Sequence, residues 1–452
     1  MRHIAVIDVG KTNAKLVLVD AITLREITVV TRPNTVLPGP PYPHFDLDGH
    51  WQFFVHHLRR FHATWGVDAI SVTTHGAAAV LLDAAGQLAT PMLDYEHDGP
   101  GALAAAYDAM RPDFADTGSP RLALGLNLGA QLHWLLETQG GLRDRTARVL
   151  TYPQYWGWLL TGEMACDLCS LGCHTDLWQP VQGRFSTLVD RLGLTGRIAT
   201  PRRPSDVLGH LRAEVAAATG LPPHTPVSVG IHDSNASLFP YLPGPAHGFS
   251  VVSTGTWVIC MAMGADVTAP DASRDVLLNV NARGQAVPSA RFMGGREYDL
   301  IRQGDATVPD RADRAAVLAR DVMLLPAVEP ASGPFAGRQM RWTCAAETAG
   351  QRMLALSWYL ALMTRCCLDL AGARGPVIVE GPFARNPDYL DMLSSLSPGG
   401  VETAASATGT SVGAALLCLG AVAPPATRPV LPVGGRSALQ AYAALWNARV
   451  LA

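Results

Sequence analysis

The chain has 452 residues, of which 48% are hydrophobic and only 16% charged, and its formal net charge is −3 at pH 7. This composition excludes a disordered chain and predicts a well-buried α/β protein, too long for one hydrophobic core. So small a charge gives no long-range attraction for nucleic acid or an anionic membrane, and we expect neither as a partner.

The sequence also predicts a cytoplasmic protein. The N-terminus enters an apolar strand at once, without the basic region and cleavage site of a secretory signal. We find no long uninterrupted apolar run of the kind that a membrane span needs. Eight cysteines in so long a chain do not indicate a disulfide framework, so we expect reduced thiols.

The first predicted element is a hairpin in residues 4–20. Its Gly10-Lys11-Thr12 turn raises the question of a phosphate-binding P-loop, which needs a second Gly five residues earlier and a helix directly afterwards. Position 5 is Ala, and residues 14–20 are apolar and β-rich, which predicts a second strand. We therefore reject the P-loop and predict a strand–turn–strand unit with Asp8 near its turn.

The elements that follow are read from their periodicity. Helical spacing of apolar residues predicts a helix over 51–65, and a buried strand is predicted over 69–74, ending in the turn His75-Gly76. Residues 78–88 read as a further strand and turn, and helices dominate from 101 to 220. The apolar strand in 226–236 ends in a polar cluster around His232 and Asp233.

Residues 249–264 read as a second strand–turn–strand unit, with Gly255-Thr256 in its turn. It lies about half the chain after the first hairpin, which suggests an internal duplication of one domain type. Segment 241–248 contains Pro and Gly residues and is the expected joint between domains 1–244 and 245–452.

Five further elements are predicted in the second half. These are a helix over 348–371, a strand over 376–381, a helix that follows Asn386-Pro387, a strand at 400–403 and a small-residue helix in 409–420. Asn386 is expected as the N-cap of its helix and Pro387 as its first residue.

Glycine-containing turns follow strands at Gly10, Gly255 and Gly381. Exposed backbone N–H groups and Thr hydroxyls at such turns suit phosphate oxygens, and Lys11 and Lys15 add positive charge beside the first turn. Ordinary hairpin turns use the same residues, so one turn alone favours no ligand. The repeated hairpin, with Asp8 and Asp233 at strand ends, favours phosphate binding.

Phosphoryl transfer to a sugar hydroxyl needs a base for the hydroxyl proton and a metal on the phosphates. Asp233 is the candidate base, and Asp8 is a candidate Mg²⁺ ligand that acts through water. The alternative for Asp233 is a helix N-cap, because residues 234–236 could begin a helix. On the residues alone, both interpretations stay open.

From Asp8 to Ala415, these motifs resemble in order those of the FGGY carbohydrate kinases, members of the actin-like, ribonuclease H-like ATPase superfamily. The resemblance implies an α/β fold of two actin-like domains with an interdomain cleft, and phosphate transfer from ATP, with Mg²⁺, to a sugar. Residues 1–244 would hold the sugar, the first phosphate motif and the catalytic Asp233. Residues 245–452 would hold the second phosphate motif and the adenosine motif.

The resemblance also implies three sets of site residues. ATP would be bound by Asp8, Gly10, Lys11, Thr12, Asn13, Lys15, Thr254, Gly255, Thr256, Gly381, Pro382, Phe383 and Asn386. Residues 408–415 would belong to the adenosine end. The sugar would be bound by His75, Gly76, Glu96, Asp98, His232 and Asp233. Mg²⁺ would be held through water by Asp8 and Asp233.

Two positions depart from the family pattern. Lys11 stands where many members carry a hydroxyl residue, and Pro382-Phe383 stands where small residues are usual. Phe383 could stack on adenine, or the nucleotide pocket could be altered.

Within the family, the chain most resembles L-fuculokinases and L-rhamnulokinases, because of "VTTHG", the His before Asp233, and Trp257 after the Gly-Thr turn. This implies a ketose acceptor, a deoxyhexulose or a pentulose, phosphorylated on a terminal hydroxyl. Two alternatives remain on the same fold, an actin-like ATPase and a non-catalytic sugar or nucleotide sensor. A homodimer also stays open.

Two other clusters could carry chemistry. Cys166, Cys169, Cys173 and His174 lie close together and suggest a metal site, but their helical spacing favours buried thiols, and metal binding stays open. The Trp-rich segment 155–163 is expected to be core packing.

Overall fold

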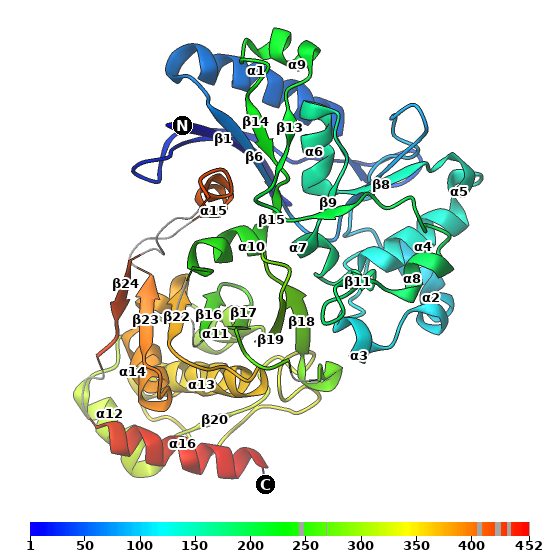
Figure 1. Cartoon of the computed structure of the whole chain (residues 1–452). Coiled ribbons are helices and arrows are strands. Elements are labelled where there is room, and N and C mark those ends of the chain that lie inside the picture. The colour runs from blue at the N-terminus through cyan, green and yellow to red at the C-terminus, as the bar shows by residue number, and fades with distance from the viewer. Residues whose placement is uncertain (244–247, 268, 405–408, 421–425, 432–434, 452) are drawn as a thin grey trace. The chain divides into compact units, whose positions relative to one another are not determined.

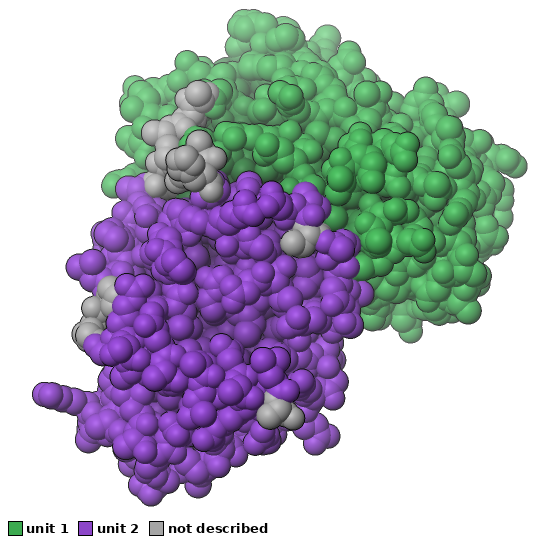
Figure 2. All heavy atoms as spheres, turned by 60° about the horizontal axis from the view of Figure 1, so that its bottom comes forward, with its two compact units in different colours: residues 1–243, 278–286, 408–424 green, residues 244–277, 287–407, 425–452 purple. Residues whose placement is uncertain are grey.

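The structure is a computed structural model that describes residues 1–243, 248–267, 269–404, 409–420, 426–431 and 435–451. It divides into two compact units, coloured separately in Figure 2. Unit 1 comprises Met1–Pro243, Leu278–Ala286 and Thr408–Pro424, and unit 2 comprises Gly244–Leu277, Val287–Ala407 and Pro425–Ala452. Residues 244–247 of the expected joint lie outside the described residues.

The main sheet of unit 1 has the strand order β13-β14-β6-β1-β2-β3. Its strands are β1 (His3–Val9), β2 (Asn13–Asp20), β3 (Arg25–Pro33), β6 (Ala69–Thr74), β13 (Val207–His210) and β14 (Pro226–Ser228). Strand β1 pairs antiparallel with β2 and parallel with β6. The Gly10-Lys11-Thr12 turn therefore joins two strands, and the rejection of a P-loop is confirmed.

Alternation along β1 sends its side chains to the two faces of this sheet. Ile7 and Val9 pack into the same core as Phe54 of helix α1 (Leu47–Trp65). Asp8 points to the opposite face, where it is hydrogen-bonded to helix α15 (Thr410–Leu416). Figure 1 shows α1 and α15 on the two sides of these strands.

The smaller elements of unit 1 lie around this sheet. They are β4 (Val36–Leu37), β5 (His44–Phe45), β7 (Ala79–Leu82), β8 (Arg148–Thr151), β9 (Cys166–Asp167), β10 (Trp178–Gln179), β11 (Arg184–Phe185), β12 (Pro201–Arg202), β15 (Ile231–His232), α2 (Ala104–Met110), α3 (Phe114–Thr117), α4 (Leu128–Thr138), α5 (Leu142–Arg145), α6 (Tyr152–Thr161), α7 (Leu168–Leu171), α8 (Thr187–Arg191), α9 (Ala213–Thr219) and α10 (Asp233–Leu238). Short 3₁₀ turns cover Gly99–Leu103 and Phe239–Tyr241.

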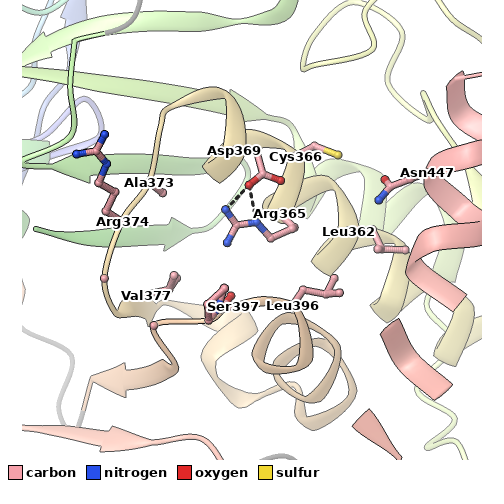
Figure 3. Close-up of a pocket in the computed structure, with 13 residues that line it drawn as sticks. Leu362, Arg365, Cys366, Asp369, Ala373, Arg374, Val377, Leu396, Ser397 and Asn447 are labelled. Carbon is pink, nitrogen blue, oxygen red and sulfur yellow. Dashed lines mark hydrogen bonds and ion pairs between the residues drawn. The ribbon is translucent and has the colours of Figure 1, made fainter. Parts of the chain in front are cut away.

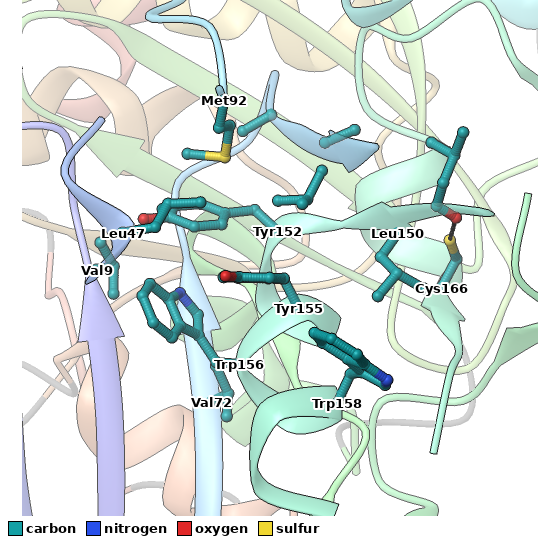
Figure 4. Packing of buried hydrophobic residues seen from close by; sticks show 14 of the residues in the cluster. Val9, Leu47, Val72, Met92, Leu150, Tyr152, Tyr155, Trp156, Trp158 and Cys166 are labelled. Atoms are coloured by element: carbon teal, nitrogen blue, oxygen red, sulfur yellow. Dashed lines mark hydrogen bonds between the residues drawn. The ribbon is translucent and has the colours of Figure 1, made fainter. Parts of the chain in front are cut away.

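Aromatic side chains of α6 form the centre of the unit 1 core (Figure 4). Trp156 is fully buried and meets the ring of Phe54 edge-on, with 5.2 Å between the ring centroids. Tyr152 and Tyr155 pack beside it, at 5.8 and 5.2 Å. The expectation that the Trp-rich segment is core packing is confirmed.

Unit 2 has a sheet in the order β18-β19-β17-β16-β22-β23-β24. Its strands are β16 (Phe249–Thr254), β17 (Val258–Met263), β18 (Val276–Val280), β19 (Ala286–Phe292), β22 (Val377–Glu380), β23 (Val401–Ala404) and β24 (Thr427–Pro429). The other elements are β20 (Leu324–Leu325), β21 (Arg341–Trp342), α11 (Gly294–Arg302), α12 (Arg311–Arg320), α13 (Ala349–Leu370), α14 (Pro387–Leu396), α16 (Arg436–Leu451) and 3₁₀ turns at Ala272–Arg274 and Pro382–Arg385.

The two sheets share one central arrangement. In unit 1 it is β3-β2-β1-β6-β14, and in unit 2 it is β19-β17-β16-β22-β23. In unit 1, β1 forms an antiparallel hairpin with β2 and pairs in parallel with β6. In unit 2, β16 forms an antiparallel hairpin with β17 and pairs in parallel with β22. The predicted repetition of one domain type is therefore confirmed.

Two segments from the second half of the sequence belong to unit 1. Leu278 donates a backbone hydrogen bond to the Gly118 carbonyl at 3.1 Å, and α15 is bonded to Asp8. These contacts join residues far apart in sequence, which is why a single boundary between residues 244 and 245 does not describe the division.

Helix α13 is long and apolar enough to cross a membrane, contrary to the expectation that no segment is. However, 78% of its most apolar window is buried inside the structure. Its Trp358 and Leu360 lie in the core of unit 2. The helix is apolar because protein surrounds it, which is the pattern of a core helix.

The cysteines near residue 170 are buried, as expected, and all eight cysteines of the chain are free thiols. Burial raises the pKa of Cys166 to about 11, and its Sγ lies 3.8 Å from the Val149 carbonyl oxygen. Among the described residues, no three His, Cys, Asp or Glu side chains are grouped as a metal site.

Candidate active site

The polar residues singled out in unit 1 lie at the ends of neighbouring strands. Asp8 is near the end of β1 and pairs with Thr73 of β6. Strand β15 also pairs in parallel with β6, with His232 opposite Thr74. Because the carboxyl ends of parallel strands meet at one edge of a sheet, the fold brings Asp8, His75 and Asp233 to the same edge.

Asp233 is the first residue of α10, and His232 occupies the N-cap position. The Oδ1 atom of Asp233 accepts a hydrogen bond from the Ser234 N–H at 2.6 Å and lies 3.3 Å from Nε2 of His232. No hydrogen bond to its Oδ2 is found among the described residues, and the side chain is 31% exposed. The predicted helix is present but starts one residue earlier, so Asp233 is not its N-cap.

The environment of Asp233 favours the protonated acid more than water does. Burial raises its pKa to about 6, while His75 and the Ser234 N–H oppose the rise and the Asp8 carboxylate adds to it. A carboxylate with a pKa in this range can accept a proton near neutral pH and still be mostly ionised.

Two buried histidines flank this carboxylate. Nδ1 of His75 lies 2.9 Å from the Gly76 carbonyl oxygen, which can only accept, so Nδ1 carries the proton. Its Nε2 is buried without a hydrogen-bond partner, as is Nδ1 of His232. Burial lowers the pKa of His75 and lowers the pKa of His232 to about 4. Both rings are therefore neutral near pH 7 and offer unused nitrogens.

Gly76 makes room for one of these rings. A Cβ at this position would come within 2.5 Å of Nε2 of His232. The expected sugar residues His75, Gly76 and His232 are thus brought together around Asp233.

Lys11, expected at the ATP phosphates, contacts acidic residues of the segment that was expected to bind the sugar. Its Nζ forms an ion pair with Asp94 and lies 3.1 Å from Oε2 of Glu96. It also lies over the rings of Tyr95 and Phe45, at 4.8 and 5.1 Å from their centroids. Sequence reasoning missed Asp94 and Phe45 and gave Tyr95 no role of its own, although Asp94 and Tyr95 directly precede the predicted Glu96.

Asp98 is not brought into this group. Its side chain is 89% exposed, and its Oδ1 lies 3.7 Å from Nδ1 of His97. The next residues begin a 3₁₀ turn, Gly99–Leu103, at whose start Asp98 lies.

The first glycine turn is tied down by backbone bonds. The Gly10 N–H donates to the Asn13 carbonyl at 2.9 Å, and Asn34 bonds both the Gly10 and Thr12 carbonyls, at 2.8 and 2.9 Å. Asn34 was not predicted from the sequence. Lys15 lies directly opposite Asp8 in the β1–β2 ladder, so the two side chains emerge on the same face.

Asp8 is 4% exposed, and its Oδ2 accepts hydrogen bonds from the hydroxyls of Thr410 and Ser411 at 2.8 and 2.7 Å. Residues 408–415 were expected at the adenosine end. The structure packs α15 inside unit 1, where Gly413 lies so close to Ala236 that a Cβ would overlap its carbonyl oxygen, and the adenosine role stays a prediction. Thr408 lies outside the described residues.

Unit 2 contains a cavity of about 1050 Å³ beside the second glycine turn. Among its lining residues are Gly255, Thr256, Gly295, Tyr298, Ser357, Pro382, Phe383 and Asn386. This cavity therefore collects most of the predicted ATP residues of the second half.

The backbone around the second turn is closely packed. The Thr254 hydroxyl donates to the Glu380 carbonyl at 2.5 Å and accepts from the Phe383 N–H at 3.1 Å. Gly381 has a φ of +83°, and a Cβ there would overlap the Thr254 carbonyl oxygen. A Cβ at Gly295 would likewise overlap the carbonyl oxygen of Gly255. Glycine is thus required by space at Gly295 and Gly381, and also by φ at Gly381.

Phe383 is only 5% exposed, and its ring packs against Tyr298 and Tyr389 at 5.8 and 5.3 Å. Tyr298 also lines the cavity and is half-buried, so it is an additional aromatic candidate for stacking on a base. Asn386 is the N-cap of α14, as predicted, and accepts a hydrogen bond from the Tyr389 N–H at 3.0 Å.

A second cavity in unit 2, of about 550 Å³, lies where α13 and α14 end (Figure 3). Its polar groups are mostly paired, since Arg365 bonds Asp369 and Arg374 bonds Asp266. The carbonyl ends of the two helices disfavour an anion here.

The described residues fit Mg²⁺ and a nucleotide. Asp8 and Asp233 are close enough for one carboxylate to raise the pKa of the other, and Mg²⁺ is held in proteins by one or two carboxylates together with substrate phosphates. The cavity of unit 2 combines a glycine turn, suited to phosphate oxygens, with aromatic rings.

Comparison with protein families identifies both halves of the chain. The N-terminal domain of the FGGY family of carbohydrate kinases matches residues 3–240. The domain described as carbohydrate kinase FGGY, C-terminal domain, matches residues 246–427. The chain belongs to the FGGY family of carbohydrate kinases, and the predicted fold of two actin-like, ribonuclease H-like domains is confirmed.

Individual relatives agree with this family. A carbohydrate kinase from Novosphingobium aromaticivorans has a similar crystal structure, with 36% identity, a TM-score of 0.92, and coverage of 99% of this chain and 100% of that one. The L-fuculokinase of Salmonella typhi is 28% identical over 277 residues, which are 58% of this chain and 57% of the relative.

The rhamnulokinase of Klebsiella pneumoniae (strain 342) is 25% identical over 308 residues, covering 65% of this chain and 59% of the relative. The chain thus spans less than two thirds of the length of the curated relatives it matches.

Proposed function

We propose that the protein is an ATP-dependent kinase that phosphorylates a terminal hydroxyl of a ketose, with Asp233 as general base. The acceptor would be a deoxyketohexose such as L-fuculose or L-rhamnulose, or a ketopentose. One observation carries this proposal: a carboxylate with an unused oxygen lies beside two neutral histidines with unused nitrogens, in a chain of the FGGY family.

The residues of unit 1 suit a hydroxyl-rich acceptor. Oδ1 of Asp233 is held by the Ser234 N–H, which leaves Oδ2 to take the proton of the attacking hydroxyl. The unused nitrogens of His75 and His232 can accept hydrogen bonds from other hydroxyls of the sugar. These contacts would orient the acceptor while Asp233 removes its proton.

ATP would be held in unit 2 by the turns at Thr254–Thr256 and at Gly381–Phe383, with Tyr298 and Phe383 beside the base. Asp8 and Asp233 would hold Mg²⁺ through water. When bound, Mg²⁺ supplies positive charge that neutralises the phosphates during transfer. The proposal includes the domain roles expected from the sequence, with 1–244 binding the sugar and 245–452 the adenosine, and a cytoplasmic location.

The pKa of Asp233 predicts the pH dependence of the reaction. Only the carboxylate form can accept the proton, so kcat/KM for the acceptor is expected to be level above about pH 6 and to fall about tenfold per pH unit below it. Initial rates at low acceptor concentration between pH 5 and 8 measure this. A profile still level at pH 5 would contradict a base with a raised pKa.

The proposed function is tested by measuring ADP release from Mg-ATP with a panel of ketoses. The panel contains L-fuculose, L-rhamnulose, L-ribulose, and D- and L-xylulose. Turnover with one ketose well above a no-sugar control is expected. ADP release without sugar would favour the actin-like ATPase, and ligand binding without any ADP would favour the sensor.

A further inference from the structure

Lys11 and Lys15 are the only lysines in the chain, and every other permanently cationic side chain is arginine. A chain that uses arginine everywhere else keeps lysine in this hairpin, where a compact ammonium and a planar guanidinium are not equivalent. Lys11 is also the position at which the first phosphate motif departs from its family. Lys11 therefore has a role for which an ammonium is suited, and its contacts indicate what it binds.

The contacts of Lys11 lie on the acceptor side of unit 1. Its ammonium is paired with Asp94, whose side chain is 8% exposed, and with Glu96, which is 58% exposed. Asp94 is fixed in turn, because its Oδ1 also accepts the Glu96 N–H at 3.2 Å. The cluster is therefore held in place on a short loop, with the Glu96 carboxylate facing solvent.

Two aromatic rings connect this cluster to the histidine beside Asp233. Phe45 and Tyr95, which lie against Lys11, also lie 5.2 and 5.1 Å from the ring of His75. The charges of Lys11 and Asp233 both act on His75. Lys11 and Asp233 thus belong to the surroundings of one histidine that is expected to bind the acceptor.

We propose that Lys11 and its two carboxylates recognise an uncharged acceptor sugar, which extends the proposed function and rests on it. An ammonium has three N–H donors, and the described contacts use two of them, on Asp94 and Glu96. The third donates to one hydroxyl of the sugar, and the exposed Glu96 carboxylate accepts from a neighbouring hydroxyl. A vicinal diol satisfies both groups.

The charge of the cluster selects against acidic sugars. One ammonium beside two carboxylates leaves a net charge of −1, and Asp233 adds a further negative charge around His75. A carboxylate-bearing acceptor, such as an aldonic acid, would be repelled by this net negative charge, most strongly beside the buried Asp94. The acceptor class is therefore neutral ketoses, and Lys11 serves the acceptor rather than the ATP phosphates.

NMR on the full chain labelled with [¹³C]lysine tests this directly, since only two side chains carry the label. The Lys11 signal is assigned with the Lys11→Arg variant. A neutral ketose is expected to shift the Lys11 signal, whereas a non-hydrolysable ATP analogue with Mg²⁺ leaves it in place. A shift of the Lys11 signal with the analogue alone overturns the proposal. The absence of a shift with every ketose of the panel also overturns it, when each ketose is present at 50-fold the enzyme concentration and at a concentration that saturates the enzyme in the ADP assay.

Kinetics supply the second readout. Lys11→Met is expected to raise KM for the ketose at least tenfold and to change KM for ATP less than twofold, with partial recovery in Lys11→Arg. The preference is the ratio of kcat/KM for a ketose to kcat/KM for the aldonate of equal carbon number. Glu96→Gln is expected to lower this ratio at least fivefold. If Lys11→Met raises KM for ATP and leaves KM for the ketose unchanged, Lys11 binds the ATP phosphates and the proposal is wrong.

The two proposals fail separately. If a ketose shifts the Lys11 signal but no ketose yields ADP, the kinase proposal is wrong and the acceptor contact stands. If ADP is formed with a ketose that leaves the Lys11 signal unchanged, the kinase proposal stands and the role of Lys11 is wrong.

Discussion

Asp233→Asn is expected to lower kcat at least about a hundredfold while nucleotide binding is retained, because loss of a general base costs on this order. Asparagine is isosteric, and its amide oxygen can still accept the Ser234 N–H that holds Oδ1. The start of α10 is therefore preserved, while the variant loses the ability to take a proton and the negative charge that would help to hold Mg²⁺. Stopped assays of sugar phosphate, with calorimetric binding of an ATP analogue, measure both effects.

Asp144→Asn is the matched control for this prediction, since Asp144 is an exposed acid of unit 1 in α5. It makes the same chemical change away from the candidate site and is expected to retain wild-type turnover. An Asp233→Asn variant that keeps more than about a tenth of wild-type activity would remove Asp233 as the base. Equal melting temperatures of the two variants would show that any loss is not caused by unfolding.

Gly381→Ala is expected to weaken binding of an ATP analogue at least tenfold. The added Cβ would overlap the Thr254 carbonyl oxygen, and the φ of +83° is unfavourable for alanine. The Thr254 hydroxyl ties this turn to the Glu380 carbonyl and the Phe383 N–H, so a displaced turn would move the lining of the unit 2 cavity. Calorimetric titration with the analogue measures the loss.

Gly337→Ala separates the steric effect from the backbone effect. Gly337 also lies in unit 2 and has a φ of +82°, but a Cβ there would meet nothing within 4 Å. Both variants carry the cost of a positive φ, about 1–3 kcal/mol, and Gly381→Ala adds the overlap and a ψ of −161°, which is almost exclusive to glycine. If the two variants bind the analogue equally well and melt at the same temperature, the close contact at Gly381 has no role in nucleotide binding.

Local signals explain which parts of the fold were predictable. The two hairpins were found because alternating or continuous apolar residues and a glycine turn lie next to each other in the chain. Asn386 was recognised as an N-cap because a capping side chain acts on an N–H only three residues away. Such signals give the elements, and the repeated hairpin gave the two related domains.

Helix α13 shows where composition alone misleads. Its length and apolarity fit a membrane span as well as a core helix, and only the surrounding protein distinguishes the two. Phe383 is similar, because its sequence position suggested stacking on adenine, whereas the fold buries most of its ring against Tyr298 and Tyr389.

The sequence by itself determined the family, the order of the motifs and the candidate base, because short motifs are contiguous in the chain. The tertiary structure decided which of these residues meet. The Lys11–Asp94 pair joins residues 83 positions apart, and the Thr410–Asp8 bond joins residues 402 positions apart. No local pattern encodes such contacts, since they depend on how strands pair and which face of the sheet each side chain occupies.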